Sequence, residues 1–100
     1  MIERKGSDSI ADVLYALNDP NPNVRFSALS GALSISLRLP QGRLESLVQY
    51  DPSAYVRALA LKAIGEDPRS DKLTVRSMAQ AALNDPDPGV QEQARDVLIR

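Results

Sequence analysis

A seven-residue phrase occurs three times in this chain of 100 residues, and its recurrence restricts the possible folds more than any other feature. "DPNPNVR" at residues 19–25 returns as "DPSAYVR" at 51–57 and as "DPDPGVQ" at 85–91, so the copies begin 32 and 34 residues apart. A fixed period of this size, with an apolar and a small residue one helical turn apart, predicts stacked helical hairpins. The recurring valines and alanines are Val24, Val56, Val90, Ala28, Ala60 and Ala94.

Each copy of the phrase predicts a corner between two helices. Proline disfavours the helical region for the residue before it, so each aspartate ends a helix. A side chain suited to an N-cap follows two residues later, and in two copies proline then takes the first helical position. The aspartates are Asp19, Asp51 and Asp85, the N-caps are Asn21, Ser53 and Asp87, and the prolines are Pro22 and Pro88.

The segments on both sides of the corners have the apolar spacing of amphipathic helices. Pro40 opens the middle hairpin, Gly65 is a candidate C-cap, and Ser70 or Asp71 is the next N-cap. The buried stripes predicted before the corners are Ile10, Val13, Leu14 and Leu17; Leu44, Leu47 and Val48; and Val75, Met78, Ala79 and Ala82. Those predicted after them are Val24, Ala28, Ala32 and Ile35; Val56, Ala60, Ala63 and Ile64; and Val90, Ala94, Val97 and Leu98. Tyr15 and Phe26 are expected in the core or in hairpin packing. The prediction is an all-α domain over residues 1–100, with hairpins at about 8–38, 40–66 and 69–100.

The phrase and the stripes together resemble the HEAT-like repeat, with the bilin-lyase subtype as the nearest fit. The features that carry the resemblance are a helix ending in Leu-Asn-Asp-Pro, a Pro-x-Val-Arg start and an alanine one turn later. Gln91, in place of Arg25 and Arg57, and Ala54, in place of proline, depart from the pattern. The resemblance implies a right-handed α-solenoid whose second helices line a concave, partner-binding face.

The aspartates and arginines of the phrase are expected to be structural. Each aspartate can accept hydrogen bonds from backbone N–H groups at its corner, and each arginine can pair with an acid in the next repeat. The predicted ladder pairs Arg25 with Asp51 and Arg57 with Asp85, as in proteins that this chain resembles. Partly exposed pairs of this kind stabilise by only ~0 to 1 kcal/mol each, so they set register more than stability.

Composition argues against several kinds of function. The chain has no cysteine and no histidine, so a thiolate metal site, a disulfide framework and the commonest general base are missing. No cofactor or metal is therefore expected, and no enzyme activity, since Ser27, Ser30 and Ser34 lack a base to activate them. Twelve basic and thirteen acidic residues nearly cancel, so nucleic acid is not an expected partner. No apolar run approaches the ~20 residues of a membrane span and no signal peptide is evident, so a cytoplasmic protein is expected.

The most distinctive residues on the polar stripe of the second helices are Tyr55 and Leu59, one turn apart in the central repeat. An aromatic and an aliphatic residue in this position could anchor a protein partner, with Ser30 and Lys62 among the polar residues around them. The alternative is that Leu59 belongs to the core under the third hairpin.

The expected function is a non-catalytic protein-interaction or assembly module that binds its partner on the concave face. One alternative is a regulatory or lyase-associated subunit that contacts a phycobiliprotein. A second alternative is a nucleic-acid-binding adaptor. The last predicted helix ends in "QARDVLIR" with no polar tail, so this edge could continue into further repeats or pair with another chain, including a second copy in a homodimer.

Overall fold

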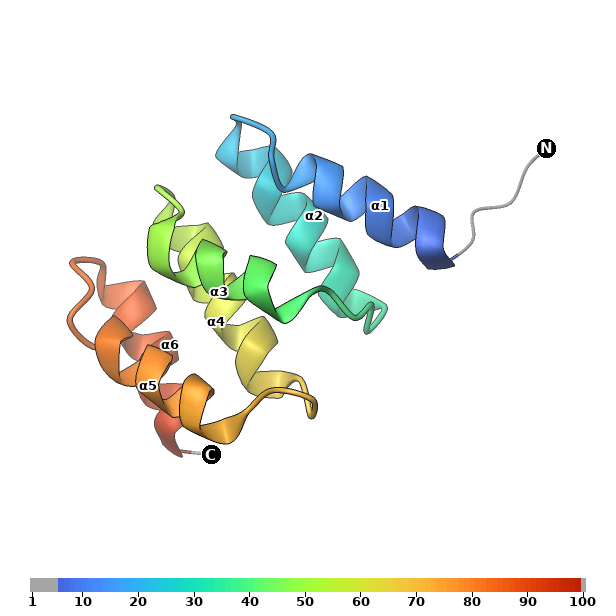
Figure 1. Ribbon diagram of the computed structural model, residues 1–100. Helices are drawn as coiled ribbons and strands as arrows, with labels where there is room; N and C mark the ends of the chain where they lie inside the picture. The colour runs from blue at the N-terminus through green and yellow to red at the C-terminus, as the bar shows by residue number, and fades with distance from the viewer. Residues whose placement is uncertain (1–5, 100) are drawn as a thin grey trace. The chain divides into compact units, whose positions relative to one another are not determined.

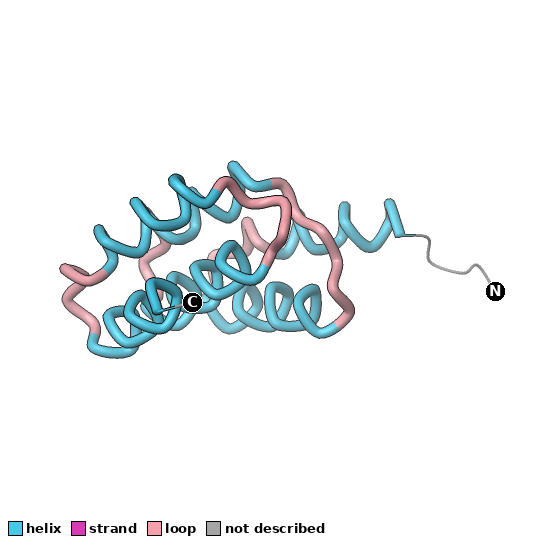
Figure 2. Tube along the Cα trace, turned by 90° about the horizontal axis from the view of Figure 1, so that it is seen from below, coloured by secondary structure: helices cyan, strands magenta, loops and turns pink. Residues whose placement is uncertain are grey.

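The computed structural model describes residues 6–99, with side chains from Ile10 onward. Within this range the chain forms helices joined by loops and contains no strand, as Figure 2 shows. The all-α class predicted from the sequence is therefore confirmed. The helices are α1 (Gly6–Ala16), α2 (Pro22–Ser34), α3 (Gln41–Tyr50), α4 (Ala54–Glu66), α5 (Lys72–Ala82) and α6 (Pro88–Ile99).

The chain divides into two compact units at the junction between Leu39 and Pro40. In the first unit, α1 and α2 pack against each other as a hairpin (Figure 1). In the second unit, α3 pairs with α4 and α5 pairs with α6, while α4 also packs against α5 and α6. The single repeat domain expected over the whole chain stays a prediction.

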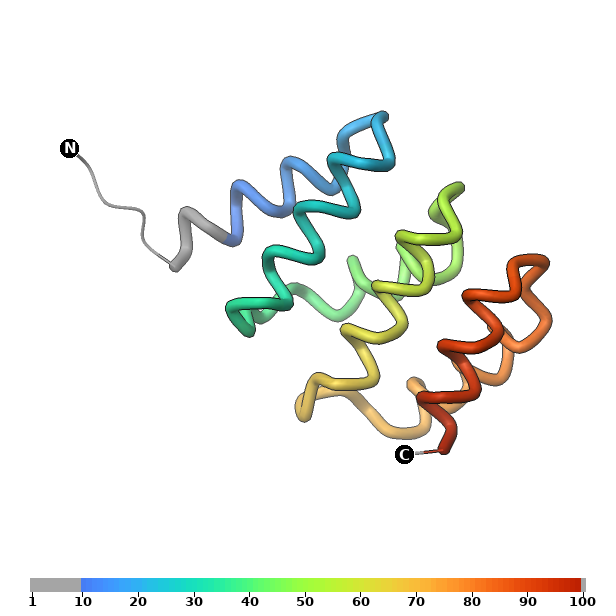
Figure 3. Tube along the Cα trace, turned by 180° about the vertical axis from the view of Figure 1, so that it is seen from behind, coloured from blue at the N-terminus to red at the C-terminus, as the bar shows by residue number. Residues whose placement is uncertain are grey.

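The core of the second unit is centred on α4. Figure 3 shows α4 and α6 side by side, with α3 and α5 behind them. Since α4 contacts each of the other three helices of this unit, more of its surface is removed from water than that of its neighbours. The predicted stripe on α4 is confirmed, and Leu61 joins it; the buried residues are Val56, Ala60, Leu61, Ala63 and Ile64. On α6 the predicted Val90, Ala94 and Val97 are buried, and on α3 the predicted Leu44, Leu47 and Val48 are buried.

Gly65 does not cap α4, so this prediction was wrong. The helix continues through Glu66, and Asp67 is its C-cap. A Cβ atom built on Gly65 would lie 3.1 Å from Cγ2 of Val97. The glycine therefore lets α4 and α6 approach closely, which is a packing role and not a backbone role.

The buried face of α2 also differs from the prediction. Val24 and Ile35 are exposed, whereas Arg25, Leu29 and Ala32 are buried. Apolar side chains cover a wide arc of α2 that includes Arg25, so the spacing alone does not determine which part of the arc turns inward. Tyr15 and Phe26, expected in packing positions, are exposed as well.

A left-handed residue ends α2. Ser36 has φ of 54° and is the only non-glycine residue with positive φ in the described range. Its N–H donates to the Leu33 carbonyl at 3.1 Å, and the Leu37 N–H donates to the Ala32 carbonyl at 2.9 Å. This pair of bonds is a Schellman motif, which satisfies carbonyls at the end of the helix.

Val24 and Val56 occupy equivalent positions in two copies of the phrase but differ in burial, with 37% and 0% of their surface exposed. Val56→Asp should reduce the free energy of unfolding by more than about 3 kcal/mol, because it places an unpaired carboxylate in the core. Val24→Asp is the matched control and should cost less than about 1 kcal/mol. Denaturant unfolding followed by circular dichroism measures both variants, and equal losses would contradict the assigned core.

Candidate functional site

The three corners share one hydrogen bond made by the aspartate side chain. In each corner its Oδ1 accepts from the backbone N–H two residues later. The distances are 2.8 Å for Asp19 with Asn21, 2.9 Å for Asp51 with Ser53 and 2.9 Å for Asp85 with Asp87. This is the structural role expected for the aspartates, and it shapes the bend after each helix.

A second shared bond closes each corner from the following helix. The side chain six residues after the aspartate donates to the aspartate's own backbone carbonyl. The donors are Arg25 Nη1 to Asp19 at 2.8 Å, Arg57 Nη1 to Asp51 at 2.9 Å and Gln91 Nε2 to Asp85 at 2.6 Å. Sequence reasoning missed this bond, although the constant spacing of six residues was a visible signal. Gln91 therefore performs the same local role as the arginines.

Arg57 makes a further contact that the glutamine at the equivalent position, Gln91, cannot make, because glutamine is shorter and has fewer N–H donors. The Nε and Nη2 of Arg57 donate to the two carboxylate oxygens of Asp85 at 2.9 and 3.0 Å. The two side chains are only 14% and 13% exposed. The Arg57–Asp85 pair that the sequence predicted is thus present, with the two-pronged geometry that suits a guanidinium. It ties the corner before α4 to the corner before α6.

The guanidinium of Arg57 holds the pKa of Asp85 below its ordinary value, although partial burial opposes this and the Asp87 N–H supports it. A lowered carboxyl pKa in the folded state stabilises the fold above the unfolded pKa of ~3.9. That contribution is lost as the pH falls through the folded pKa. The other predicted pair, Arg25 with Asp51, would join residues of different units and stays a prediction.

The helix caps agree with the sequence in most places. Asn21 accepts from the N–H of Asn23, and Asp87 accepts from the N–H groups of Gly89 and Val90. Ser53 is the N-cap residue of α4, as predicted, but its side chain makes no capping bond, and its own N–H donates to Asp51.

Asp71, and not Ser70, caps α5. Hydrogen bonds from the Thr74 N–H and hydroxyl lower the pKa of Asp71. Ser70 donates instead to the Ile64 carbonyl at 2.8 Å, which holds the loop between α4 and α5 against the end of α4.

Three of the predicted partner-binding residues lie on one side of α4. Tyr55 is 78% exposed, Leu59 is half-buried and Lys62 is exposed. Their spacing of four and three residues places them in a row along the helix, and together they are called the α4 face below. Ser30 is exposed but lies on α2, in the other unit, so the structure does not group it with them. At the C-terminal edge, Val97 is buried, Leu98 is half-buried and Ile99 is exposed.

From Ile10 to Ile99 no three acidic side chains gather in a way that could hold a metal ion. Among the helices described within residues 6–99, none has the length and apolar character needed to span a bilayer.

Comparisons of the chain with models of protein families, with curated protein sequences and with solved structures gave no match. The likeness to HEAT-like repeats therefore depends on the residues of the three corners and on the helices that they join.

The two roles of Arg57 can be separated by substitution, because Gln91 shows that glutamine can make the corner bond. Arg57→Gln should keep that bond and lose only the pair with Asp85, at a cost of about 1 to 2 kcal/mol at pH 7. Arg57→Ala should lose both and cost about 1 kcal/mol more, while Gln91→Ala should lose the corner bond alone. Urea unfolding measures the three costs.

The same variants have a pH signature. The difference in stability between the unmodified protein and Arg57→Gln should shrink as the pH falls below about 4, because Asp85 then takes up a proton. A difference that stays constant down to pH 2 would show that the pair does not account for it.

Proposed function

We propose that the chain is a right-handed α-solenoid of three HEAT-like hairpins that binds a protein partner in the cytoplasm, without catalysis. The observation that carries the binding proposal is the exposed ring of Tyr55 on the most firmly packed helix of the second unit. The proposed contact surface is the α4 face, with Tyr55 as its anchor and Leu59 and Lys62 beside it.

Tyrosine is suited to this role because it offers a large apolar ring and a hydroxyl while losing little conformational freedom on binding. Next to Tyr55 in the chain, Val56 is completely buried, and Ala60 one turn later is buried as well. The backbone that carries the tyrosine is therefore fixed by the core, and a partner would meet a prearranged surface. Lys62, two turns along the same face, supplies a charge that could fix the orientation of the partner.

The solenoid proposal is supported by the corners. The same two hydrogen bonds recur at all three, and in the second unit the bond from Arg57 to Asp85 links one hairpin to the next. Arg25 occupies the position in the first corner that Arg57 occupies in the second. A pair between Arg25 and Asp51 would continue the series to the first hairpin.

A double-mutant cycle tests that continuation. Arg25→Gln and Asp51→Asn each keep the hydrogen-bonding groups needed within their own corners. Combined, they should cost less than the sum of the single costs, with a coupling of about 1 kcal/mol. Thermal or urea unfolding supplies the four stabilities, and strictly additive costs would overturn the proposed Arg25–Asp51 pair.

The binding proposal is tested with two matched tyrosines, since Tyr50 and Tyr55 are 77% and 78% exposed. Tyr55→Ala should weaken capture of the partner from a lysate of the native cells by about tenfold or more, while Tyr50→Ala should have little effect. Quantitative mass spectrometry of the captured proteins provides the measurement, and circular dichroism checks that both variants keep their helical content.

A photo-crosslinking amino acid at position 55 sharpens the result, because it should label the same protein whose capture Tyr55→Ala weakens. The proposal fails if both tyrosine variants capture every protein equally well, or if position 55 labels none of the captured proteins.

A further inference from the structure

A pocket of about 330 Å³ lies at the end of the second unit where α4 stops, α5 begins and α6 stops. This volume is at the lower end of the range for small-ligand sites, so the pocket suits one amino-acid residue better than an extended cofactor. It differs from the α4 face, since Tyr55, Leu59 and Lys62 are not among its residues. Its lining consists of Gly65, Glu66, Asp67, Pro68, Ser70, Lys72, Val75, Arg76, Val97 and Leu98.

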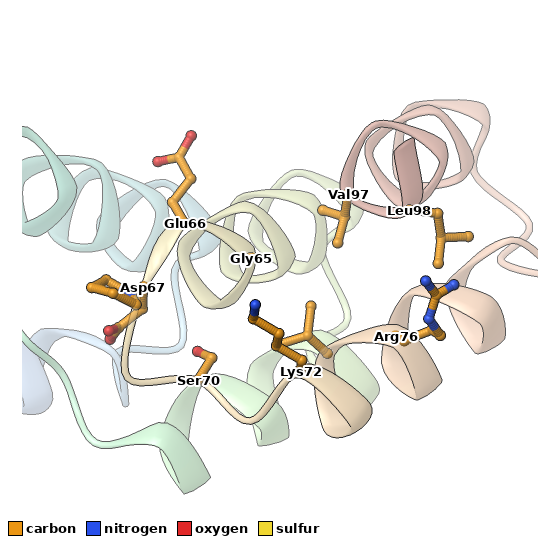
Figure 4. A pocket seen from close by; sticks show the side chains of 10 residues that line it. Gly65, Glu66, Asp67, Ser70, Lys72, Arg76, Val97 and Leu98 are labelled. Atoms are coloured by element: carbon orange, nitrogen blue, oxygen red, sulfur yellow. The ribbon is translucent and has the colours of Figure 1, made fainter. Parts of the chain in front are cut away.

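Two cations in this lining lack partners. Lys72 and Arg76 lie one turn apart on α5, and neither makes an ion pair or hydrogen bond with its side chain in the part of the chain that the structure describes. In Figure 4 the ammonium of Lys72 lies below Gly65, and the guanidinium of Arg76 reaches towards Leu98. Both positive groups are thus available to an incoming anion.

The two acidic residues of the lining do not neutralise these cations. The carboxylate of Asp67 accepts hydrogen bonds from Gln41 at 2.9 Å and from Arg69 at 2.7 Å. The carboxylate of Glu66 points away from Lys72 and Arg76 in Figure 4. The charge exposed to an occupant of the pocket is therefore positive.

The rest of the lining includes an apolar surface from two helices. Val97 and Leu98 come from α6 and Val75 comes from α5. Val97 also packs against Gly65, so its position is determined by the close contact of α4 and α6. A ligand that contacts this apolar surface and also pairs with a cation needs an aliphatic group close to its negative charge.

We propose that this pocket binds the C-terminal residue of a peptide chain when that residue is aliphatic. Such a residue carries a carboxylate and an aliphatic side chain on the same Cα, so one residue meets both requirements. An internal residue of a peptide supplies only one of the two. The carboxylate pairs with Arg76, Lys72 adds a second positive charge to the pocket, and the side chain covers Val75, Val97 and Leu98. This site does not depend on the function proposed for the α4 face.

The test uses an acetylated glycine–serine peptide that ends in leucine with a free carboxylate, titrated into ¹⁵N-labelled protein. Amide shifts should change at Gly65, Lys72 and Val97. Amidating the peptide or replacing its leucine by glycine should each weaken binding, by about tenfold and fivefold respectively. Arg76→Gln should weaken binding of the free acid by about tenfold. Arg95→Gln is the matched control, because Arg95 is exposed on α6 outside the pocket.

Each alternative gives a different result that would overturn the proposal. Equal binding of the amide and the acid would show that the pocket does not recognise the carboxylate. Tighter binding of a phosphoserine peptide with an amidated end would assign the cations to phosphate instead. An absence of shifts at millimolar peptide would leave the pocket without this ligand. Because Arg76 is exposed, its substitution should leave the spectrum of the folded protein intact, and binding can be compared directly.

Discussion

The hydrogen bonds of the Arg57 guanidinium are the interactions on which the arrangement of the two hairpins in the second unit depends. One of its nitrogens closes the corner before α4 through the Asp51 carbonyl, and two others hold the carboxylate of Asp85 in the next corner. A single side chain thereby sets both the start of its own helix and its register with the following hairpin. Because the pair is largely removed from water, its hydrogen bonds compete weakly with solvent and its geometry is well determined.

These bonds help to position α4, and this helix runs from one proposed site to the other. Its N-terminal turn carries Tyr55 beside the corner that Arg57 closes, and its C-terminal end carries Gly65 beside the pocket. The helix between them is fixed by buried Val56, Leu61 and Ile64. The α4 face is therefore carried by this helix alone, whereas at the pocket α4 supplies Gly65 and Glu66, and α5 and α6 supply the positive charge and the apolar side chains.

Much of the local structure was predictable because it depends on neighbours in the chain. Proline restricts the residue before it, and aspartate or asparagine side chains reach backbone N–H groups two or three residues away, so the corners and most caps follow from the sequence. The stripe on α4 was predicted from the recurring valine and alanine positions, although Leu61 was missed. The face of α2 was not, because Leu29 lies on a different side of the helix from Val24 and Ile35, and packing decides between the two sides.

The sequence by itself determined the all-α class and the place of each corner, because these depend on short-range sterics and on a repeated register, while the pairing partner of Arg57 followed from the resemblance to HEAT-like repeats. The tertiary structure alone decided that Gly65 serves the contact with Val97, and that Lys72 and Arg76 share a pocket with Leu98. The residues of these contacts lie on α4, α5 and α6, which are separate segments of the chain. Their contacts depend on the distance and angle at which helices pack, which a spacing pattern does not encode.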